Sequence, residues 1–195
     1  AKINKIKKII HTSTSEVYGT AKYVPIDENH PLNAQSPYSA SKISADHIAQ
    51  SFYNSFNLPV VTLRPFNAFG PRQSLRAIIP TIMGQAINEK KIKVGNLKPT
   101  RDFNFVEDIA NGFYMTLKSK NKKIFGEVIN LGTGYEISIK NLLDIIKKIS
   151  NKNFLFKVEN KRVRFSKSEV YRLKASNKKA MKLIDLVGLN GREEN

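Results

Sequence analysis

Apolar positions along the chain predict an alternation of short buried strands and amphipathic helices. Apolar, β-branched runs are typical of strands covered on both faces, and they occur over 7–13, 58–65 and 126–132. Helices are expected over 38–56, 107–118 and 137–150, of which the last has the clearest apolar stripe. This alternation favours an α/β fold with a parallel sheet.

Local signals predict the remaining elements. Ser36 and Pro37 supply an N-cap and a first turn for the helix over 38–56. Pro80 is compatible with a helix over 79–89 only because it falls in the first turn. Shorter strands are expected over 91–95, 101–106 and 154–158. Loops are expected over 16–37 and 66–74, and no element is expected in the closing residues 191–195.

Composition limits the classes of function. The 195 residues, 41% of them hydrophobic, suffice for one sizeable core with a small second lobe. The chain has no cysteine, and His11, His30 and His47 have no metal-ligand spacing, so no metal site is expected. Apolar runs are too short for a membrane span and no signal peptide is recognisable, so we expect a cytoplasmic protein.

The formal net charge of +17 raises the question of nucleic-acid binding. A nucleic-acid footprint gathers cations on one face, ideally with stacking aromatics, whereas the lysines here are spread from Lys2 to Lys182. We therefore expect no specific nucleic-acid partner, and only a weak attraction to anionic ligands.

Tyr38 and Lys42 carry the first candidate chemistry. Four residues apart on a helix, they project from one face, and an ammonium beside a phenol lowers its pKa from about 10. Such a tyrosine can act as a general base towards an alcohol. Thr14 and Glu16 follow a predicted strand, although a strand-end cap and a solvated loop carboxylate would explain each of them separately.

Five motifs in a fixed order identify a family. The segments STSEVYG, YSASK, LRPFNAFGPRQS, RDFNFVED and NLGTG follow one another between Ile9 and Ala180. Together they resemble the extended short-chain dehydrogenase/reductases, specifically the NAD-dependent nucleotide-sugar 4,6-dehydratases and epimerases. The resemblance implies the C-terminal part of a Rossmann-like parallel sheet plus a smaller mixed α/β substrate-binding lobe. Residues 1–70 would belong to the NAD-binding domain and 71–195 mainly to the nucleotide-sugar lobe, with 101–131 returning to the Rossmann core.

The glycine-rich loop with which such proteins bind the NAD pyrophosphate has no counterpart ahead of these motifs. Gly132 and Gly134 lie far downstream and lack a third glycine, and the chain begins with Ala1. We therefore expect a fragment that lacks roughly 100 residues of the N-terminal Rossmann half, several βα units in length. Alone, it would hold NAD poorly and would be inactive.

The resemblance also implies roles for individual residues. Thr14 would bind the sugar 4-OH, Tyr38 would take its proton, and Lys42 would bind the nicotinamide ribose. The backbone of Pro65 and Phe66 would border the nicotinamide. The substrate diphosphate would meet Asn67 and Arg101, and Arg164 would contact a phosphate or ribose. Ile78 and Ile79 would pack beside the nucleotide base, although helix core explains them equally well.

Glu16 favours a dehydratase over an epimerase. A dehydratase must remove the proton at carbon 5, whereas a 4-epimerase needs no further base and usually carries a small or hydroxyl residue there. The TSE version of the motif resembles GDP-mannose-type and N-acetylglucosamine-type dehydratases. The segments GPRQSLRAIIPTI and KSEVYRL are most similar to the N-acetylglucosamine-type dehydratases of legionaminic-acid pathways, which serve cell-surface polysaccharides. UDP and GDP remain open, and so do a 4-epimerase and an inactive fragment that only binds nucleotide. The resemblance further implies a homodimer through the helix that carries Tyr38 and Lys42.

Overall fold

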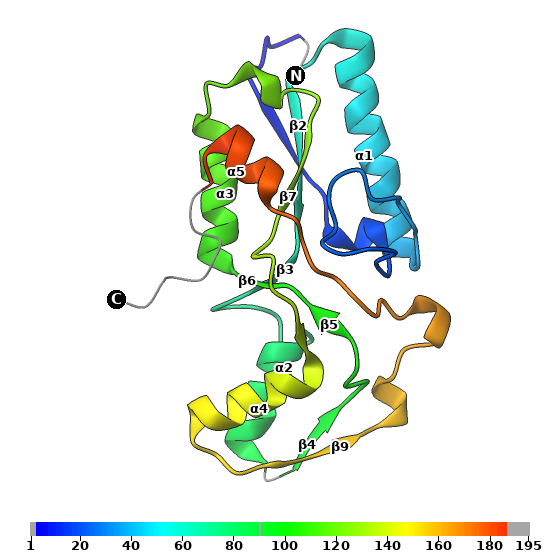
Figure 1. Cartoon of the computed structure of the whole chain (residues 1–195), viewed down its shortest axis with the longest axis vertical. Helices are drawn as coiled ribbons and strands as arrows, with labels where there is room; N and C mark the ends of the chain where they lie inside the picture. The colour runs from blue at the N-terminus through cyan, green and yellow to red at the C-terminus, as the bar shows by residue number, and fades with distance from the viewer. Residues whose placement is uncertain (1–2, 90, 187–195) are drawn as a thin grey trace.

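A parallel three-stranded sheet forms the centre of the larger body in the computed structural model, which describes residues 3–89 and 91–186 (Figure 1). Its order is β1 (Ile9–Thr12), β2 (Val60–Pro65), β7 (Val128–Leu131), with Ile9 opposite Val60 and Thr62 opposite Val128. All three strands run in one direction, so their carboxyl ends meet at one edge. The α/β class and parallel pairing predicted from the apolar pattern are confirmed.

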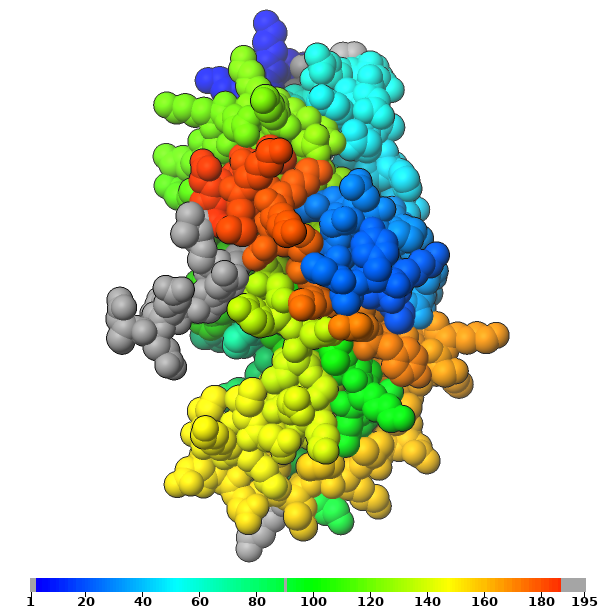
Figure 2. All heavy atoms as spheres, viewed as in Figure 1, coloured from blue at the N-terminus to red at the C-terminus, as the bar shows by residue number. Residues whose placement is uncertain are grey.

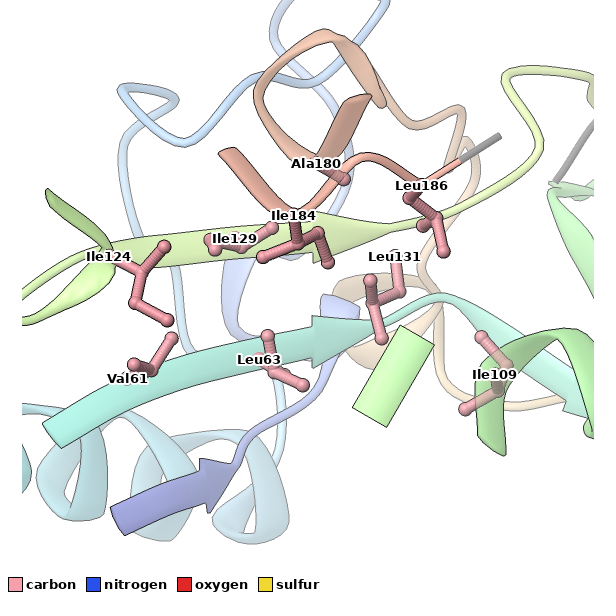
Figure 3. Packing of buried hydrophobic residues seen from close by; sticks show 9 residues of the cluster. All are labelled: Val61, Leu63, Ile109, Ile124, Ile129, Leu131, Ala180, Ile184 and Leu186. Carbon is pink, nitrogen blue, oxygen red and sulfur yellow. The ribbon is translucent and has the colours of Figure 1, made fainter. Parts of the chain in front are cut away.

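Helices cover both faces of this sheet. The helix α1 (Pro37–Phe56) lies on one side, and α3 (Val106–Lys118) and α5 (Lys178–Ile184) lie on the other. Apolar side chains of α3 and α5 meet those of β2 and β7 in one core, in which Leu63, Ile129 and Ile184 are almost wholly buried (Figure 3). Burial of this apolar surface holds the helices to the sheet.

A smaller second body packs below the sheet, formed by α2 (Ile78–Asn88), α4 (Ile139–Ser150) and the parallel pair of β4 (Lys91–Val94) and β9 (Leu155–Val158). Its own core is built around Ile82, Ile92, Leu143 and Phe154. The strand β9 is exposed along its length, as its alternating sequence at the edge of a two-stranded sheet allows.

Two short strand pairs join the bodies. The strand β3 (Asn67–Phe69) pairs in parallel with β6 (Phe103–Phe105), and β5 (Thr100–Arg101) pairs antiparallel with β8 (Ile137–Ser138). Single turns of 3₁₀ helix are η1 (Ser15–Tyr18), η2 (Lys122–Ile124), η3 (Asn160–Arg162) and η4 (Ser166–Ser168). The C-terminal segment that ends in α5 lies against the N-terminal loop, orange beside blue in Figure 2, and Ile26 bridges to Ala175.

The predicted helices over 38–56, 79–89, 107–118 and 137–150 are present with ends shifted by at most two residues. Three predictions were wrong. The single strand over 101–106 is two strands with different partners, because Asp102 turns into the interior between them. The loop over 66–74 begins with β3, and the loop over 16–37 begins with η1, whose Tyr18 is fully buried. The prediction for 191–195 lies outside the described residues.

None of the helices in the described part of the chain has the length and apolar character needed to cross a membrane.

Candidate active site

Two adjoining cavities lie where the carboxyl ends of the sheet strands face the second body. The inner cavity, of about 260 Å³, is bordered by Ser13–Glu16, Tyr38 and Pro65–Ala68, which follow β1 and β2. The outer cavity, of about 410 Å³, extends into the second body. Glu16, Asn67 and Ala68 line both, so the two form one continuous cleft. Ligands of open α/β sheets bind at this edge.

The helix α1 begins at this cleft because its first turn is capped. The Ser36 side chain accepts from the Ser39 amide, the Ser39 hydroxyl accepts from the Ser36 amide, and Pro37 occupies the first helical position. The helix therefore starts at a fixed residue, and Tyr38 projects from its first turn into the inner cavity with 55% of its surface exposed.

Lys42 lies one turn further along α1. Its Nζ donates to the carbonyl oxygen of Thr12, the last residue of β1, at 2.5 Å. Lys42 lines neither cavity, but this bond holds its ammonium at the strand end beside the residues that do.

Thr14 has a capping role and also a place in the wall of the inner cavity. Its Oγ1 accepts from the Glu16 amide at 3.3 Å and so caps η1, while the residue lines the inner cavity. Because the oxygen acts as an acceptor in the cap, the hydroxyl proton remains for donation to a ligand. Glu16 is half-buried and lines both cavities, at their junction.

The outer cavity is rich in cations. Its lining includes Arg76, Lys93, Arg101, Arg162 and Arg164, against the two carboxylates of Glu16 and Glu169. Arg101 is the most enclosed, with 12% of its side chain exposed, and its Nη2 lies 3.5 Å from Glu169 Oε1. Burial lowers the pKa of the Arg101 guanidinium, and the nearby Glu169 and Glu16 oppose that shift. Such an array suits a polyanion such as a diphosphate.

Two amides in the cavity wall have unused acceptors. Asn67 Oδ1 and Gln73 Oε1 are buried and make no hydrogen bond within the described residues. Gln73 Nε2 donates to Ala68 O at 2.8 Å, which fixes the orientation of its amide. A buried acceptor without a donor is costly, so both atoms indicate a wall that is completed by a ligand or by water.

The structure brings ten of the eleven predicted site residues to this cleft, and Lys42 to its edge. Ile78 and Ile79 line the outer cavity and also pack against the core of the second body. Their position is therefore compatible with both predictions, contact with a nucleobase and a place in the helix core. Sequence reasoning missed Gln73, Arg76, Lys93, Arg162 and Glu169 as cavity residues. Gln73 and Arg76 lie inside the quoted GPRQSLRAIIPTI segment and Glu169 inside KSEVYRL, whereas no pattern marks Lys93 and Arg162.

Asp102 is a buried anchor that the sequence did not reveal. Its carboxylate accepts from the Thr133 amide and hydroxyl, the Gly134 amide and the Ala175 amide, at 2.6–3.0 Å. Burial raises the pKa of this carboxyl group, and these hydrogen bonds counteract the shift. Through these bonds Asp102, which directly follows Arg101, holds the NLGTG loop and the C-terminal segment in place.

No group of three or more histidine, aspartate or glutamate side chains is arranged to hold a metal ion within residues 3–89 and 91–186.

Comparison with known proteins identifies the family. The family model described as GDP-mannose 4,6 dehydratase matches residues 1–186. The chain belongs to this family. Family membership predicted from the five motifs is thereby confirmed.

Relatives of this GDP-mannose 4,6 dehydratase family member include both reaction types. A dTDP-D-glucose 4,6-dehydratase of Dictyostelium discoideum is 40% identical over 75% of this chain and 35% of the relative. A putative UDP-glucose 4-epimerase of Methanocaldococcus jannaschii is 36% identical over 73% of this chain and 47% of the relative. The chain thus spans between about a third and half of the length of these two relatives.

Among solved structures, the UDP-glucuronic acid 4-epimerase of Bacillus cereus, determined with UDP-glucuronic acid and NAD, has a TM-score of 0.87. It is 31% identical and covers 97% of this chain and 60% of its own. A UDP-N-acetylglucosamine 4-epimerase of Methanobrevibacter ruminantium, solved with UDP-N-acetylmuramic acid, has a TM-score of 0.83 at 31% identity, covering 94% of this chain and 58% of its own.

Proposed function

We propose that the protein is an NAD-dependent nucleotide-sugar 4,6-dehydratase. The observation that supports this most is the position of Glu16 at the junction between the Tyr38 cavity and the cationic cavity. A sugar held by its diphosphate in the outer cavity would extend its hexose into the inner one, past this carboxylate.

The residues of the inner cavity fit the nicotinamide end of NAD. Lys42 offers an ammonium at the end of β1, and the Pro65 and Phe66 segment forms one wall of the cavity. NAD held there would supply the acceptor for the hydride of carbon 4 and, once reduced, the hydride donor for carbon 6. Tyr38 takes the proton of the 4-OH, and the Thr14 hydroxyl holds the same oxygen.

Dehydration requires one further base. Once carbon 4 is a ketone, the proton on carbon 5 is acidic, and the Glu16 carboxylate removes it. Glu16 passes this proton, directly or through a water, to the 6-OH, which departs as water, and carbon 5 regains a proton from solvent as the hydride reaches carbon 6. The product is a 4-keto-6-deoxy sugar nucleotide. Asn67 and Arg101 bind the diphosphate, and Arg164 contacts a phosphate or ribose. Ile78 and Ile79 pack against the nucleobase.

The substrate class is an N-acetylglucosamine nucleotide, with either UDP or GDP. Support comes from Ser15-Glu16 in the TSE motif and from the KSEVYRL segment, in which Glu169 faces Arg101. In this proposal the product enters the synthesis of legionaminic-acid-type sugars for the cell surface.

The test is the mass of the product. The full-length gene product, supplied with NAD, is incubated with UDP- and GDP-N-acetylglucosamine, and the expected product lacks one water. Glu16→Gln abolishes that loss because the amide cannot accept the carbon 5 proton. Glu127→Gln is the matched control, since Glu127 pairs with Lys179 away from both cavities. Water loss that survives Glu16→Gln contradicts the role of Glu16.

A 4-epimerase is the second candidate, and the similarity to the Bacillus cereus and Methanocaldococcus jannaschii proteins favours it. Both reactions begin with oxidation at carbon 4, so Tyr38, Lys42 and Thr14 would keep their roles. A product of unchanged mass with inverted carbon 4 would establish this reaction. Binding of the nucleotide sugar without turnover would instead support a protein that only binds.

A further inference from the structure

Asp46 is a buried carboxylate on the same face of α1 as the two proposed active-site residues. It follows Tyr38 by eight residues and Lys42 by four, and consecutive fourth residues lie above one another on a helix. Only 5% of its side chain is exposed, in contrast to Tyr38 at the start of the helix. A buried charge needs partners, and those of Asp46 come from β2, from β1 and from the residue that follows β1.

Two of the three partners of Asp46, Ser13 and Arg64, adjoin or line the cleft. Its Oδ1 lies 2.9 Å from His11 Nε2, and its Oδ2 accepts from Ser13 Oγ at 2.8 Å. The same Oδ2 accepts from Arg64 Nε at 3.1 Å and Nη2 at 2.9 Å. Ser13 directly precedes Thr14, and Arg64 directly precedes Pro65. One carboxylate therefore joins α1 to the ends of β1 and β2.

Arg64 extends this connection to the far end of the Glu16 segment. Its Nη1 donates to Tyr18 Oη at 2.9 Å, and Tyr18 Oη donates to Asn130 Oδ1 of β7 at 2.8 Å. The short segment from Ser13 to Tyr18 is thus held at one end by Asp46 and at the other by Arg64. Thr14 and Glu16 lie between these two attachments.

We infer that the buried Asp46–Arg64 pair positions Thr14, Glu16, Tyr38 and Lys42 relative to one another. The inference rests on the proposed function for the roles of those four residues. Replacement of a buried ion pair by apolar residues often leaves stability unchanged, so the pair is better explained by the geometry it imposes than by stabilisation. Its guanidinium and carboxylate have directional bonds that apolar packing cannot supply.

The test measures kcat and KM of the full-length gene product for the nucleotide sugar. Asp46→Asn is expected to lower kcat about tenfold or more while KM changes less than about twofold, because the diphosphate-binding arginines lie in the other cavity. Arg64→Lys keeps the charge but loses the paired bonds, so it is expected to lower kcat as well. Hydrogen–deuterium exchange of the cofactor-free protein should increase over 12–18 in both variants.

One control and two further variants make the outcome decisive. Thr116→Val removes another buried hydrogen bond, to Gly112 O within α3, and should leave kcat unchanged. Ser13→Ala removes a single bond to Asp46, and should lower kcat severalfold even if Asp46→Asn does not fold. Tyr38→Phe must abolish turnover. If it does not, the proposed function fails; if it does while Ser13→Ala and Arg64→Lys keep wild-type kcat, the positioning role is refuted.

Discussion

At the scale of single residues, Arg101 lines the outer cavity and has the carboxylate of Glu169 beside it as a counter-ion. Its guanidinium is largely enclosed in the outer cavity, and Glu169 at 3.5 Å is 8% exposed. The pair keeps an arginine charged and oriented in a site that burial would otherwise disfavour. A diphosphate entering the cavity would meet a guanidinium whose orientation is already set.

Arg101→Lys should therefore weaken substrate binding more than it affects chemistry. Lysine keeps the charge but loses the planar, two-pronged contact, so KM for the nucleotide sugar should rise about tenfold with kcat nearly unchanged. Steady-state kinetics measure both constants. The matched control is Arg172→Lys, at an arginine that pairs with Glu136 and is half exposed. Equal effects of the two substitutions would contradict a role of Arg101 in binding.

Residues with a local signature could be predicted, and residues defined by distant partners could not. Tyr38 and Lys42 become candidates through their four-residue spacing, and Glu16 through the family resemblance of the TSE motif. Asp102 meets its partners 31 and 73 residues later, and Asp46 meets Arg64 18 residues later. Nothing local separates such buried carboxylates from surface ones, because only folding brings their donors together.

At the scale of elements, periodicity and capping are sufficient to predict α1 without knowledge of its tertiary contacts. The predicted Ser36-Pro37 start is present with its capping box. Elements made of two or three residues were predicted incompletely: β3 was expected to be loop, and β5 and β6 were expected to be one strand. These strands are defined by pairing with remote strands and not by an apolar period. The short helix α5 was missed as well, since its seven residues include three lysines.

The outer face of α1 leads to a prediction about assembly. Ile48 and Phe52 are 59% and 45% exposed, four residues apart on one face, and we propose that this face forms a homodimer. Replacing both with glutamate should convert a dimeric gene product to a monomer, because charges there resist burial. Light scattering after size-exclusion chromatography measures the mass. Leu117→Glu, at an equally exposed position on α3, should leave the dimer intact. A monomeric wild type would refute the proposal.

At the scale of the whole molecule, the cleft exists because two separately packed bodies meet at the strand ends. Its lining comes from segments around 13–16, 65–81, 93–103 and 162–169, together with Tyr38 of α1 and Ile139 of α4. The parallel sheet and the amphipathic helices were predictable, and with them the edge at which a ligand would bind. The contribution of Lys93 or Arg162 depends on how the bodies dock, which no periodicity in the sequence encodes.

The buried hydrogen bonds among Asp46, Arg64 and Tyr18 should make the stability of the folded molecule sensitive to alkali. Burial raises the pKa of Tyr18 to about 12, while Arg64 acts in the opposite direction. An unfolded chain releases this proton near the ordinary pKa of about 10. Between these two values the unfolded state binds fewer protons, so the free energy of unfolding should fall as pH rises, by up to about 1.4 kcal/mol per pH unit.

Tyr18→Phe should remove this part of the pH dependence. Its free energy of unfolding, measured by urea denaturation between pH 8 and 11, should be lower than wild type at pH 8, because Arg64 and Asn130 lose a partner. The gap should then narrow above about pH 10, since only the wild type has this phenol to ionise on unfolding. Tyr114→Phe, which removes an exposed phenol on α3, controls for the substitution itself. A gap that stays constant up to pH 11 would mean that Tyr18 ionises in the folded protein as it does in the unfolded chain.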